Sequence, residues 1–501
     1  MSENRILPLA GYTDRLSARP GDAVEVKVSS LGTTPYHASL VRVLYADPNP
    51  DGPGVQEDVV VSSFEGDYSS REQKFYPGSC GIIETPEALS TLKSFTAYAT
   101  IWPTTPKQGD QTILAHREGN RGWSLGLDEQ GCVVGRLGDG NGFREINLPI
   151  PLRTRQWYRI WLGFDADTKT ATLGQTALNP YYRNESRVSR DKDFRFLAAS
   201  AACAFGIAAQ LEVESHEHFN GKVEAPGIYD RSLSSGEMDR AFQGERFSGL
   251  VAHWDFSRDI PTPRITDVGP HQLHGRLRNT PARGMTGSNW NAREMCWRHA
   301  PKEYGAIHFH DDDIYDFDWE TDFRFTIPEN LRSGVYAVKL ACEGHEDRLP
   351  LFVLPTQGKR RADVCVLVST FTYAVYGNHA RSDFHDDWRK RIQDWNAYPH
   401  NPVDYRQYGL STYNHHSDGS GICFASHRRP LLNLRPGYLT FGEGVGSGLR
   451  HFQADSHLYA WLEAKGFDYD LITDQELHEE GIACLRDYPV VCTGSHPEYH
   501  T

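Results

Sequence analysis

The chain has 501 residues, of which 39% are hydrophobic and 24% charged, and 52 Lys and Arg residues against 66 Asp and Glu residues give it a formal net charge of −14. This hydrophobic content suffices for several buried cores, so a disordered chain is excluded, and the length predicts about three domains. The acidic balance, with no basic stripe, argues against nucleic acid and against an anionic membrane surface as partners.

The N-terminus and the cysteines together predict a cytoplasmic location. The first residues lack the basic and apolar regions of a signal peptide, and no later stretch reaches about 18 uncharged apolar residues, so neither secretion nor a membrane span is expected. Nine cysteines are spread singly from Cys80 to Cys492 without a Cys-x-x-Cys motif. This pattern is typical of reduced thiols rather than of a disulfide framework or a zinc site.

From the N-terminus to about residue 355 the chain is rich in short alternating runs bounded by Gly, Pro, Asp and Asn, which predict β-sandwiches. An early pair of strands and a late pair have the pattern of one small sandwich; they are Val24–Val28, Leu40–Leu44, Gly334–Leu340 and Leu351–Leu354. We therefore predict an Ig-like β-sandwich over residues 1–70 and 318–358, divided by an insertion.

The insertion contains the signature of a second, larger sandwich. Its long predicted strands are Phe95–Trp102, Trp123–Leu127 and Trp157–Phe164. Together with Phe219–Val223 and Ile228–Arg231 they resemble a laminin-G or concanavalin-like jelly roll, which we place at residues 71–250, followed by a joining segment at 251–317. Such modules often bind glycans or calcium. A structural module inside an enzyme is the alternative, and the lack of a carboxylate cluster on an obvious loop rim favours it.

Residues 359–501 change to the pattern of an α/β domain. Arg361–Ser369 contains a nearly continuous apolar run, which is typical of a strand buried on both faces of a parallel sheet. Two further strands and two helices follow the same pattern; they are Phe467–Thr473, Tyr488–Thr493, Ser456–Lys465 with Leu458, Trp461 and Leu462 on one face, and Asp474–Arg486 with Asp474 as N-cap. We predict a doubly wound parallel α/β domain. Because the sequence stops directly after a strand, we expect this domain to be incomplete.

Two loops of this domain concentrate groups that carry chemistry. In open α/β sheets, ligands bind beyond the carboxyl ends of the strands, where the sequence places Thr370–His379 and Gly494–His500. His496 and Glu498 lie two residues apart, so both side chains can enter one pocket if the backbone there is extended. In the alternative interpretation the tyrosines pack the sheet edge and Glu498 caps a following helix.

Nucleophilic catalysis is disfavoured by the surroundings of the candidate nucleophiles. Cys365 and Cys492 lie within apolar strands, where a thiol behaves as a small hydrophobe. Asp418-Gly419-Ser420-Gly421 places a serine between glycines, but the spacing is not that of a nucleophile elbow. We predict a flexible polar loop there.

A second set of metal-ligand residue types occurs at His308-Phe309-His310-Asp311-Asp312-Asp313. In a strand, His308 and His310 share a face, an arrangement that suits zinc or iron. The acidic run continues through Asp316 and Asp318, however, so a solvated turn is expected. His415-His416 is likewise expected to be a polar loop pair.

The order and spacing of three stretches indicate a family. They are Trp254-Asp255-Phe256 with His274–Leu277 and Asn279–Gly284; Tyr373–Asn378; and Trp461–Glu463 through Asp470 and Thr473 to Gly494–Tyr499. Along essentially its whole length, the chain resembles the large, catalytic subunits of the N,N-dimethylformamidases. The resemblance implies a laminin-G-like domain and a C-terminal amidotransferase-like α/β domain.

The resemblance also implies an activity and a cofactor. It implies hydrolysis of N,N-dimethylformamide, a small linear amide, to dimethylamine and formate at a mononuclear Fe3+ held by two tyrosines and one carboxylate. Tyr376 matches the first phenol and Glu498 the carboxylate, while Tyr413 is the favoured second phenol and Tyr438 the alternative. Phenolate and carboxylate are hard oxygen donors that suit a highly charged ion.

Two further residues and a partner follow from the same resemblance. His496 is expected to act as a catalytic group, orienting water or moving a proton, or else to fix Glu498 through a hydrogen bond. Asn378 is expected to contact the substrate. A separate small subunit would make the protein a hetero-oligomer. The competing hypothesis is a glycan-binding protein that uses the laminin-G-like sandwich and has an inactive α/β domain.

Overall fold

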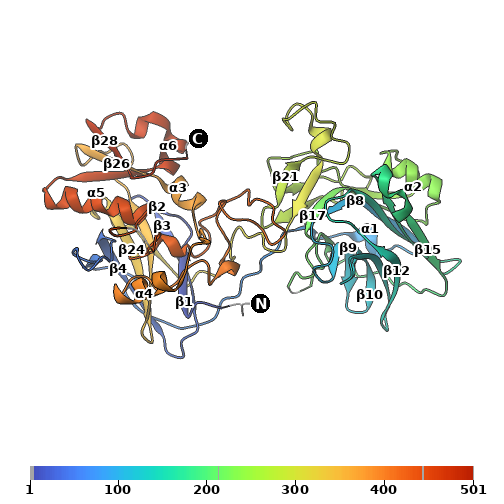
Figure 1. Ribbon diagram of the computed structural model, residues 1–501, viewed down its shortest axis with the longest axis horizontal. Coiled ribbons are helices and arrows are strands. Elements are labelled where there is room, and N and C mark those ends of the chain that lie inside the picture. Colours follow the sequence, from blue (N-terminus) through green and yellow to red (C-terminus); the bar gives the residue numbers. More distant parts are fainter. Residues whose placement is uncertain (1–4, 213, 443–444, 500–501) are drawn as a thin grey trace. The chain divides into compact units, whose positions relative to one another are not determined.

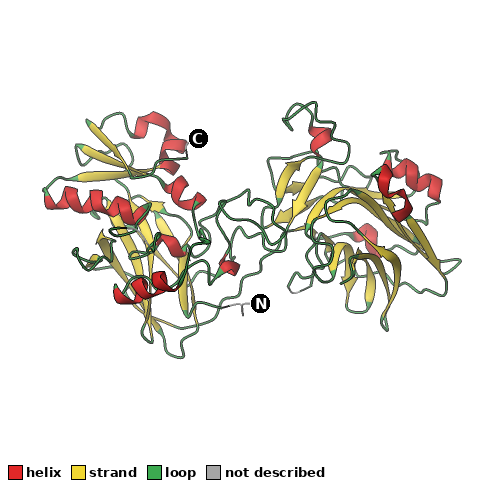
Figure 2. Cartoon of the chain, in the orientation of Figure 1, coloured by secondary structure: helices red, strands yellow, loops and turns green. Residues whose placement is uncertain are grey.

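The computed structural model describes residues 5–212, 214–442 and 445–499, and its chain forms two compact units. Unit 1 comprises Met1–Phe75, Tyr315–His415 and Gly421–Thr501, and unit 2 comprises Tyr76–Ile314 and His416–Ser420. Strands dominate both units (Figure 2), as the sequence predicts. Within the described ranges, every helix is too short or too polar to cross a membrane.

Unit 2 is a sandwich of two eight-stranded antiparallel sheets. The first sheet has the order β12 (Phe143–Pro151), β11 (Cys132–Asp139), β10 (Arg121–Leu127), β9 (Gln111–Glu118), β16 (Phe205–Ile207), β7 (Cys80–Ile83), β20 (Gly275–Arg278) and β19 (Arg264–Ile265). The second has the order β15 (Arg187–Asp191), β14 (Thr170–Ala177), β13 (Tyr158–Asp165), β8 (Phe95–Pro103), β17 (Gly221–Tyr229), β22 (Ala306–Phe309) and β21 (Ala282–Met285), with β18 (Leu250–His253) beside β17. The short helices of this unit are α1 (Glu87–Ser90), α2 (Ser235–Phe242), η1 (Pro180–Glu185) and η2 (Pro301–Tyr304).

Apolar side chains from both sheets form one core between them. Trp123 of β10 is fully buried, and its ring stacks on Phe95 of β8 with the ring centroids 5.0 Å apart. On the outer face of the second sheet, Trp161 packs with Tyr98, Tyr229 and Met238. The tryptophan-rich strands predicted from the sequence therefore supply the packing that holds the sandwich together.

Unit 1 begins with two smaller sheets that enclose a core of their own and are antiparallel except for the pair of β2 and β25. One contains β1 (Leu9–Thr13), β3 (Ala23–Ser30) and β23 (Phe323–Thr326), and the other contains β2 (Ser17–Ala18), β25 (His345–Val353), β24 (Gly334–Cys342), β4 (Tyr36–Tyr45) and β5 (Gln56–Val60), with β6 (Gly66–Tyr68) beside β4. The early and the late strands meet in these sheets: β3 pairs with β23 and β4 pairs with β24.

The remainder of unit 1 is built around three parallel strands in the order β27 (Tyr469–Thr473), β26 (Val364–Val368) and β28 (Val490–Thr493). Its helices are α3 (Thr370–Val375), α4 (Asp386–Asp394), α5 (Phe452–Ala464) and α6 (Asp474–Glu480), with the single turns η3 (Arg406–Tyr408), η4 (Leu432–Leu434) and η5 (Gly481–Cys484). The predicted parallel strands are present. The described residues do not form a doubly wound domain, because the parallel sheet has only these three strands and its central strand, β26, packs toward the β4–β24 sheet and α5 (Figure 1).

Two details of the predicted helices are wrong. The N-cap of α6 is Thr473 rather than Asp474, because Thr473 and Glu476 form a reciprocal capping box. The buried face of α5 carries Tyr459 and Leu462, whereas Trp461 is 52% exposed. Trp461 instead lies beside Phe467, with the ring centroids 6.1 Å apart.

None of the nine cysteines, all of which lie among the described residues, forms a disulfide. Cys365 is fully buried in β26, where burial raises the pKa of its thiol to about 12. Because the thiolate is the reactive form, this cysteine is a packing residue rather than a nucleophile, as its apolar strand predicts.

Replacing Trp123 with alanine tests the packing of unit 2. The substitution removes a fully buried ring from the space between the sheets, so we expect a loss of about 3–5 kcal/mol from the free energy of unfolding of this unit. Calorimetry of the full chain should show one transition shifted to lower temperature. The matched control, Trp461→Ala, removes a half-exposed ring and should leave that transition in place; equal shifts in both variants would contradict the assignment.

Candidate functional site

The two loops predicted from the strand ends begin at the same edge of the parallel sheet. β26 pairs in parallel with β28, with Leu367 opposite Thr493, so the segments that follow them leave the sheet side by side. After β26 the chain turns into α3, and Tyr376 caps the C-terminus of that helix by donating its backbone N–H to Thr372 O at 3.0 Å. The Tyr376 side chain is only 4% exposed.

The loop after β28 is fixed by hydrogen bonds to buried groups. The backbone N–H of Ser495 donates to the Asp455 carboxylate of α5, and the N–H of Glu498 donates to Thr372 Oγ1 at 3.2 Å. A Cβ atom at Gly494 would lie 2.4 Å from Asp455 Oδ2, so a larger residue there would displace this carboxylate. Residues from α3 and α5 therefore position Glu498; His500, at the end of this predicted loop, lies outside the described residues.

A third segment, distant in sequence, completes the site. The backbone N–H of Thr412 donates to Val375 O at 3.3 Å, which brings Tyr413 beside α3. The rings of Tyr413 and Tyr376 stack, with centroids 4.2 Å apart and an interplanar angle of 11°. Tyr413 is 41% exposed, so it forms the outer wall of the site while Tyr376 forms its floor.

The oxygen atoms of these three side chains converge. Tyr376 Oη donates to Glu498 Oε2 at 2.9 Å, and Tyr413 Oη donates to Glu498 Oε1 at 3.1 Å. The hydroxyl of Tyr499 shares a short hydrogen bond with that of Tyr413. Two phenols and one carboxylate therefore meet within hydrogen-bonding distance, and the phenol of Tyr499 adjoins them through Tyr413.

The protonation of this cluster follows from its contacts. Partial desolvation tends to raise the pKa of Glu498, but hydrogen bonds from Tyr376 and Tyr413 outweigh it and hold the pKa below its ordinary value. Burial raises the pKa of Tyr376, and the hydrogen bond with Tyr376 raises that of Tyr413. In the absence of a cation, the cluster therefore consists of a carboxylate that accepts hydrogen bonds from two neutral phenols.

His496 lies on the other side of the carboxylate, between Glu498 and a basic pair that sequence reasoning missed. His496 Nε2 is 3.2 Å from Glu498 Oε2, and its Nδ1 is 3.4 Å from both Arg450 Nε and His451 Nε2. Arg450 can only donate, so Nδ1 accepts and the ring proton lies on Nε2, facing Glu498. Arg450 also lies 4.0 Å from the centre of the Tyr376 ring. Burial, with Arg450 and His496 adding to it, lowers the pKa of His451 to about 3.

The remaining two predicted residues lie outside the oxygen cluster. Asn378 is 1% exposed, and its amide donates to Tyr408 O and Pro430 O and accepts from the Leu432 N–H. These bonds hold the first loop to its neighbours, and contact of Asn378 with a substrate stays a prediction. Tyr438 is buried elsewhere, where its hydroxyl accepts a hydrogen bond from Asn401 at 3.3 Å.

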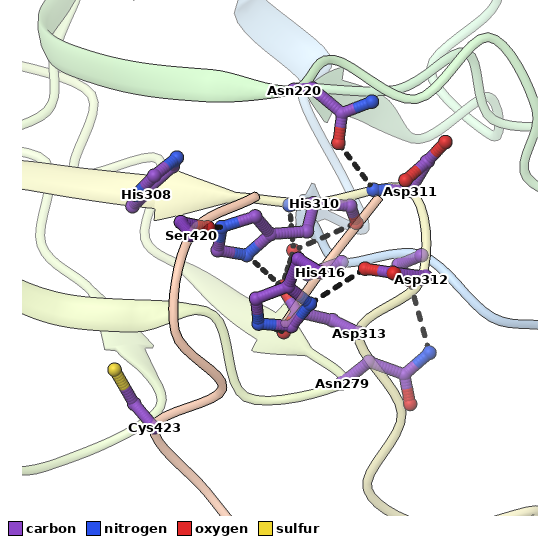
Figure 3. A network of polar contacts seen from close by, with 12 residues as sticks. Asn220, Asn279, His308, His310, Asp311, Asp312, Asp313, His416, Ser420 and Cys423 are labelled. Atoms are coloured by element: carbon purple, nitrogen blue, oxygen red, sulfur yellow. Dashed lines mark hydrogen bonds and ion pairs between the residues drawn. The ribbon is translucent and has the colours of Figure 1, made fainter. Parts of the chain in front are cut away.

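The segment expected to be a solvated acidic turn is buried at His308, His310 and Asp313, so that prediction is wrong for these residues, whereas Asp318 at its end is exposed. His308 and His310 are 4% and 2% exposed, because residues 416–420 of unit 2 cover them. Figure 3 shows the rings of His310 and His416 lying face to face, with centroids 3.7 Å apart. Burial lowers the pKa of His308 to about 4, whereas contacts with Asp312 and Asp313 overcome burial and raise the pKa of His416.

The same packing contradicts two further predictions. His416 is not part of a solvated loop pair, and Asp418–Gly421 is not a flexible loop, because both are held against β22. His416 Nδ1 is 2.6 Å from Asp312 Oδ1, and His308 Nε2 is 3.2 Å from Asp418 Oδ2. Two groups of three side chains in this region have the composition and spacing of metal ligands: His308, His310 and Asp418, and His310, Asp313 and His416.

Comparisons with known proteins place the chain in a family. A family model described as N,N-dimethylformamidase beta subunit-like, C-terminal, matches residues 282–501. The N,N-dimethylformamidase beta subunit of Paracoccus aminophilus is 38% identical over 535 residues, which cover 99% of this chain and 69% of that protein. The chain belongs to the N,N-dimethylformamidase beta subunit family. The beta subunit of the Alcaligenes sp enzyme is 37% identical over 530 residues, which cover 99% of this chain and 68% of that protein.

The family assignment confirms an N,N-dimethylformamidase subunit and covers the sites described above. Its members bear the name beta subunit, rather than the name of a large catalytic subunit that the sequence resemblance suggested. The residues that match the family model include the phenol and carboxylate cluster and the buried histidines. Among solved structures, the CBM40 module of the Ruminococcus gnavus IT-sialidase matches 34% of this chain and 94% of its own, with a TM-score of 0.28 and 17% identity. A TM-score of this size supports no conclusion about function.

Proposed function

We propose that this chain is the catalytic, large subunit of an amide hydrolase that cleaves N,N-dimethylformamide to dimethylamine and formate. The observation that carries the proposal is the convergence of Tyr376, Tyr413 and Glu498, whose oxygen atoms meet beyond the carboxyl ends of β26 and β28. The names of the relatives at 38% and 37% identity support the substrate.

The donor set fits a mononuclear ferric ion. The three side chains offer hard, potentially anionic oxygen atoms, which suit Fe3+ better than a soft or nitrogen-preferring ion. The Glu498 oxygens lie 2.9 and 3.1 Å from the phenol oxygens, so Tyr376, Tyr413 and Glu498 would together hold the ion. When bound, such an ion supplies a Lewis acid for the amide carbonyl and activates water.

The surrounding side chains prepare the cluster for this role. The stacked rings of Tyr376 and Tyr413 hold both hydroxyls toward Glu498. The Arg450 guanidinium over the Tyr376 ring favours negative charge on that phenol, because a nearby cation stabilises an anion. The bond from the Glu498 backbone to Thr372 keeps the carboxylate directed at the phenols. The site is therefore assembled before substrate arrives, which limits the cost of ordering it.

His496 has a role that its hydrogen bonds define. Its Nε2–H faces Glu498, while Nδ1 accepts from Arg450. We assign it to hold the carboxylate in place and to relay a proton: the imidazole takes up the proton that the attacking water loses and passes it to the departing dimethylamine, a step that a positioned imidazole accelerates by about 10²–10⁴-fold. Arg450 and the neutral His451 set its tautomer and are positioning residues.

The proposal includes the rest of the predicted organisation. The Ig-like part at 1–70 and 318–358, the laminin-G-like part at 71–250 and the joining segment at 251–317 serve as scaffold, and residues 359–501 carry the chemistry. The beta-subunit name of the relatives supports a second, smaller subunit. We propose a cytoplasmic hetero-oligomer.

Removing single oxygen donors tests the iron site. Tyr376→Phe deletes one hydroxyl at nearly constant ring volume, and Glu498→Gln removes the charge with little change of shape, so folding should survive. We expect iron affinity to fall at least about tenfold in each, with a parallel loss of dimethylformamide hydrolysis. Iron per chain and formate release measure both effects.

Two control variants make this result specific. Tyr438→Phe makes the same chemical change at a buried tyrosine outside the cluster and should keep its iron, and so should His308→Ala. Full iron occupancy in Tyr376→Phe and Glu498→Gln, or loss of iron only in His308→Ala, would end the assignment.

His496→Gln separates the two roles of the histidine. Glutamine keeps an N–H that can reach Glu498 but cannot exchange a proton near neutral pH. We expect normal iron content and a kcat lower by about 10²–10⁴-fold, while His457→Gln on α5 leaves kcat unchanged. If the glutamine variant retained full turnover, His496 would only orient Glu498.

A further inference from the structure

A second buried cluster lies in unit 2, where residues 416–420 cover strand β22. Strand β22 carries His308, the turn after it carries His310 and Asp313, and the covering segment brings His416 and Asp418. Figure 3 shows His310, Asp313 and His416 close together, with Ser420 of the covering segment beside His310. None of them takes part in the proposed amide hydrolysis, so the cluster requires an explanation of its own.

Three of these side chains have the arrangement of a ligand set. The side chains of His308, His310 and Asp418 are 5%, 2% and 0% exposed. Asp418 Oδ2 is 3.2 Å from His308 Nε2 and 3.8 Å from His310 Nε2. Tetrahedral zinc with bonds of about 2.0–2.1 Å separates its ligands by about 3.3–3.4 Å, which lies between these two distances.

The hydrogen bonds around His310 orient one ring nitrogen toward this centre. His310 Nδ1 is 3.0 Å from Asp313 Oδ2, as in the carboxylate–histidine pairs that orient metal-binding imidazoles. A neutral His310 that donates from Nδ1 has a lone pair at Nε2, and the nearest polar atom to that nitrogen is Ser420 Oγ at 2.9 Å.

The lone pair of His310 Nε2 has no hydrogen-bond donor. The Ser420 hydroxyl has one proton, and Asp418 Oδ1 lies 2.5 Å from its oxygen, so the carboxylate takes that proton. The Nε2 lone pair then faces only acceptors, which is costly in a buried site. A cation between Nε2 and Asp418 would satisfy both groups.

We propose that His308, His310 and Asp418 bind a divalent transition metal of the zinc class. Two imidazole nitrogens and one carboxylate are an established donor set for Zn2+, and a cation among them satisfies the lone pair of His310 and the charge of Asp418 together. Asp313 orients His310, and Ser420 holds the other oxygen of Asp418. The metal would fasten residues 416–420 to β22 within unit 2.

Zinc reconstitution of the untagged, full-length protein tests the site. The protein is stripped with a chelator, exposed to equimolar ZnCl2, desalted and analysed for zinc by mass spectrometry. We expect about one zinc per chain in the wild type and at least about tenfold less in His308→Ala and in Asp418→Asn, which preserves the shape of the side chain. The apparent Tm of the stripped wild type should rise with ZnCl2, and that of Asp418→Asn should not.

Two control variants keep this test separate from the iron site. His299→Ala alters an exposed histidine of the same unit and should retain the zinc. Tyr376→Phe should retain zinc while losing iron, and Asp418→Asn should do the reverse. Equal zinc in the wild type and Asp418→Asn, zinc lost only in Tyr376→Phe, or no zinc uptake by the wild type would overturn the proposal.

Discussion

Parallel pairing of β26 with β28 is the constraint on which the candidate active site depends. It places the segments after both strands at one edge of the sheet, where α3 presents Tyr376 and the extended segment after β28 presents Glu498. Tyr413 comes from a loop with no regular structure and reaches the same place because its neighbour Thr412 bonds to the end of α3. A short sheet thus determines the position of groups separated by more than a hundred residues of sequence.

Buried polar groups maintain this geometry. Burying them costs free energy of desolvation, which nearby hydrogen-bond donors offset. Asp455 is 2% exposed, yet its carboxylate accepts bonds from the Ser495 backbone and the Tyr373 hydroxyl. A buried charge without such partners would be strongly destabilising, so the anchor of the second loop is itself stabilised by α3. The same principle governs unit 2, where every carboxylate named around His310 and His416 has an imidazole or hydroxyl partner.

Local patterns in the sequence predicted the strands and loops better than they predicted burial. The rule that ligands bind at strand ends identified Tyr376 and Glu498 from the apolar runs before them, because strand direction and strand end are local properties. Tyr413 depended on a family resemblance, since a tyrosine in an irregular loop has no periodic signal. Arg450 and His451 were missed for the same reason.

The error at His308–Asp313 has a different physical origin. An acidic run between strands is usually solvated, and here it is covered by residues that lie more than a hundred positions later in the chain. No local pattern reports such a contact. Trp461 shows a different limit. The apolar periodicity correctly predicted helix α5, but the strands that pack against the helix decide which of its faces is buried.

The measurement that tests the central claim most directly is the visible absorption spectrum of the purified, iron-loaded protein. Phenolate bound to Fe3+ gives an intense charge-transfer band, because an electron-rich anion lies directly against an oxidising ion. We predict a coloured protein whose band scales with iron per chain and disappears in Tyr376→Phe with its iron. A colourless protein with full iron occupancy and full amide hydrolysis would contradict phenolate ligation and with it the proposed site.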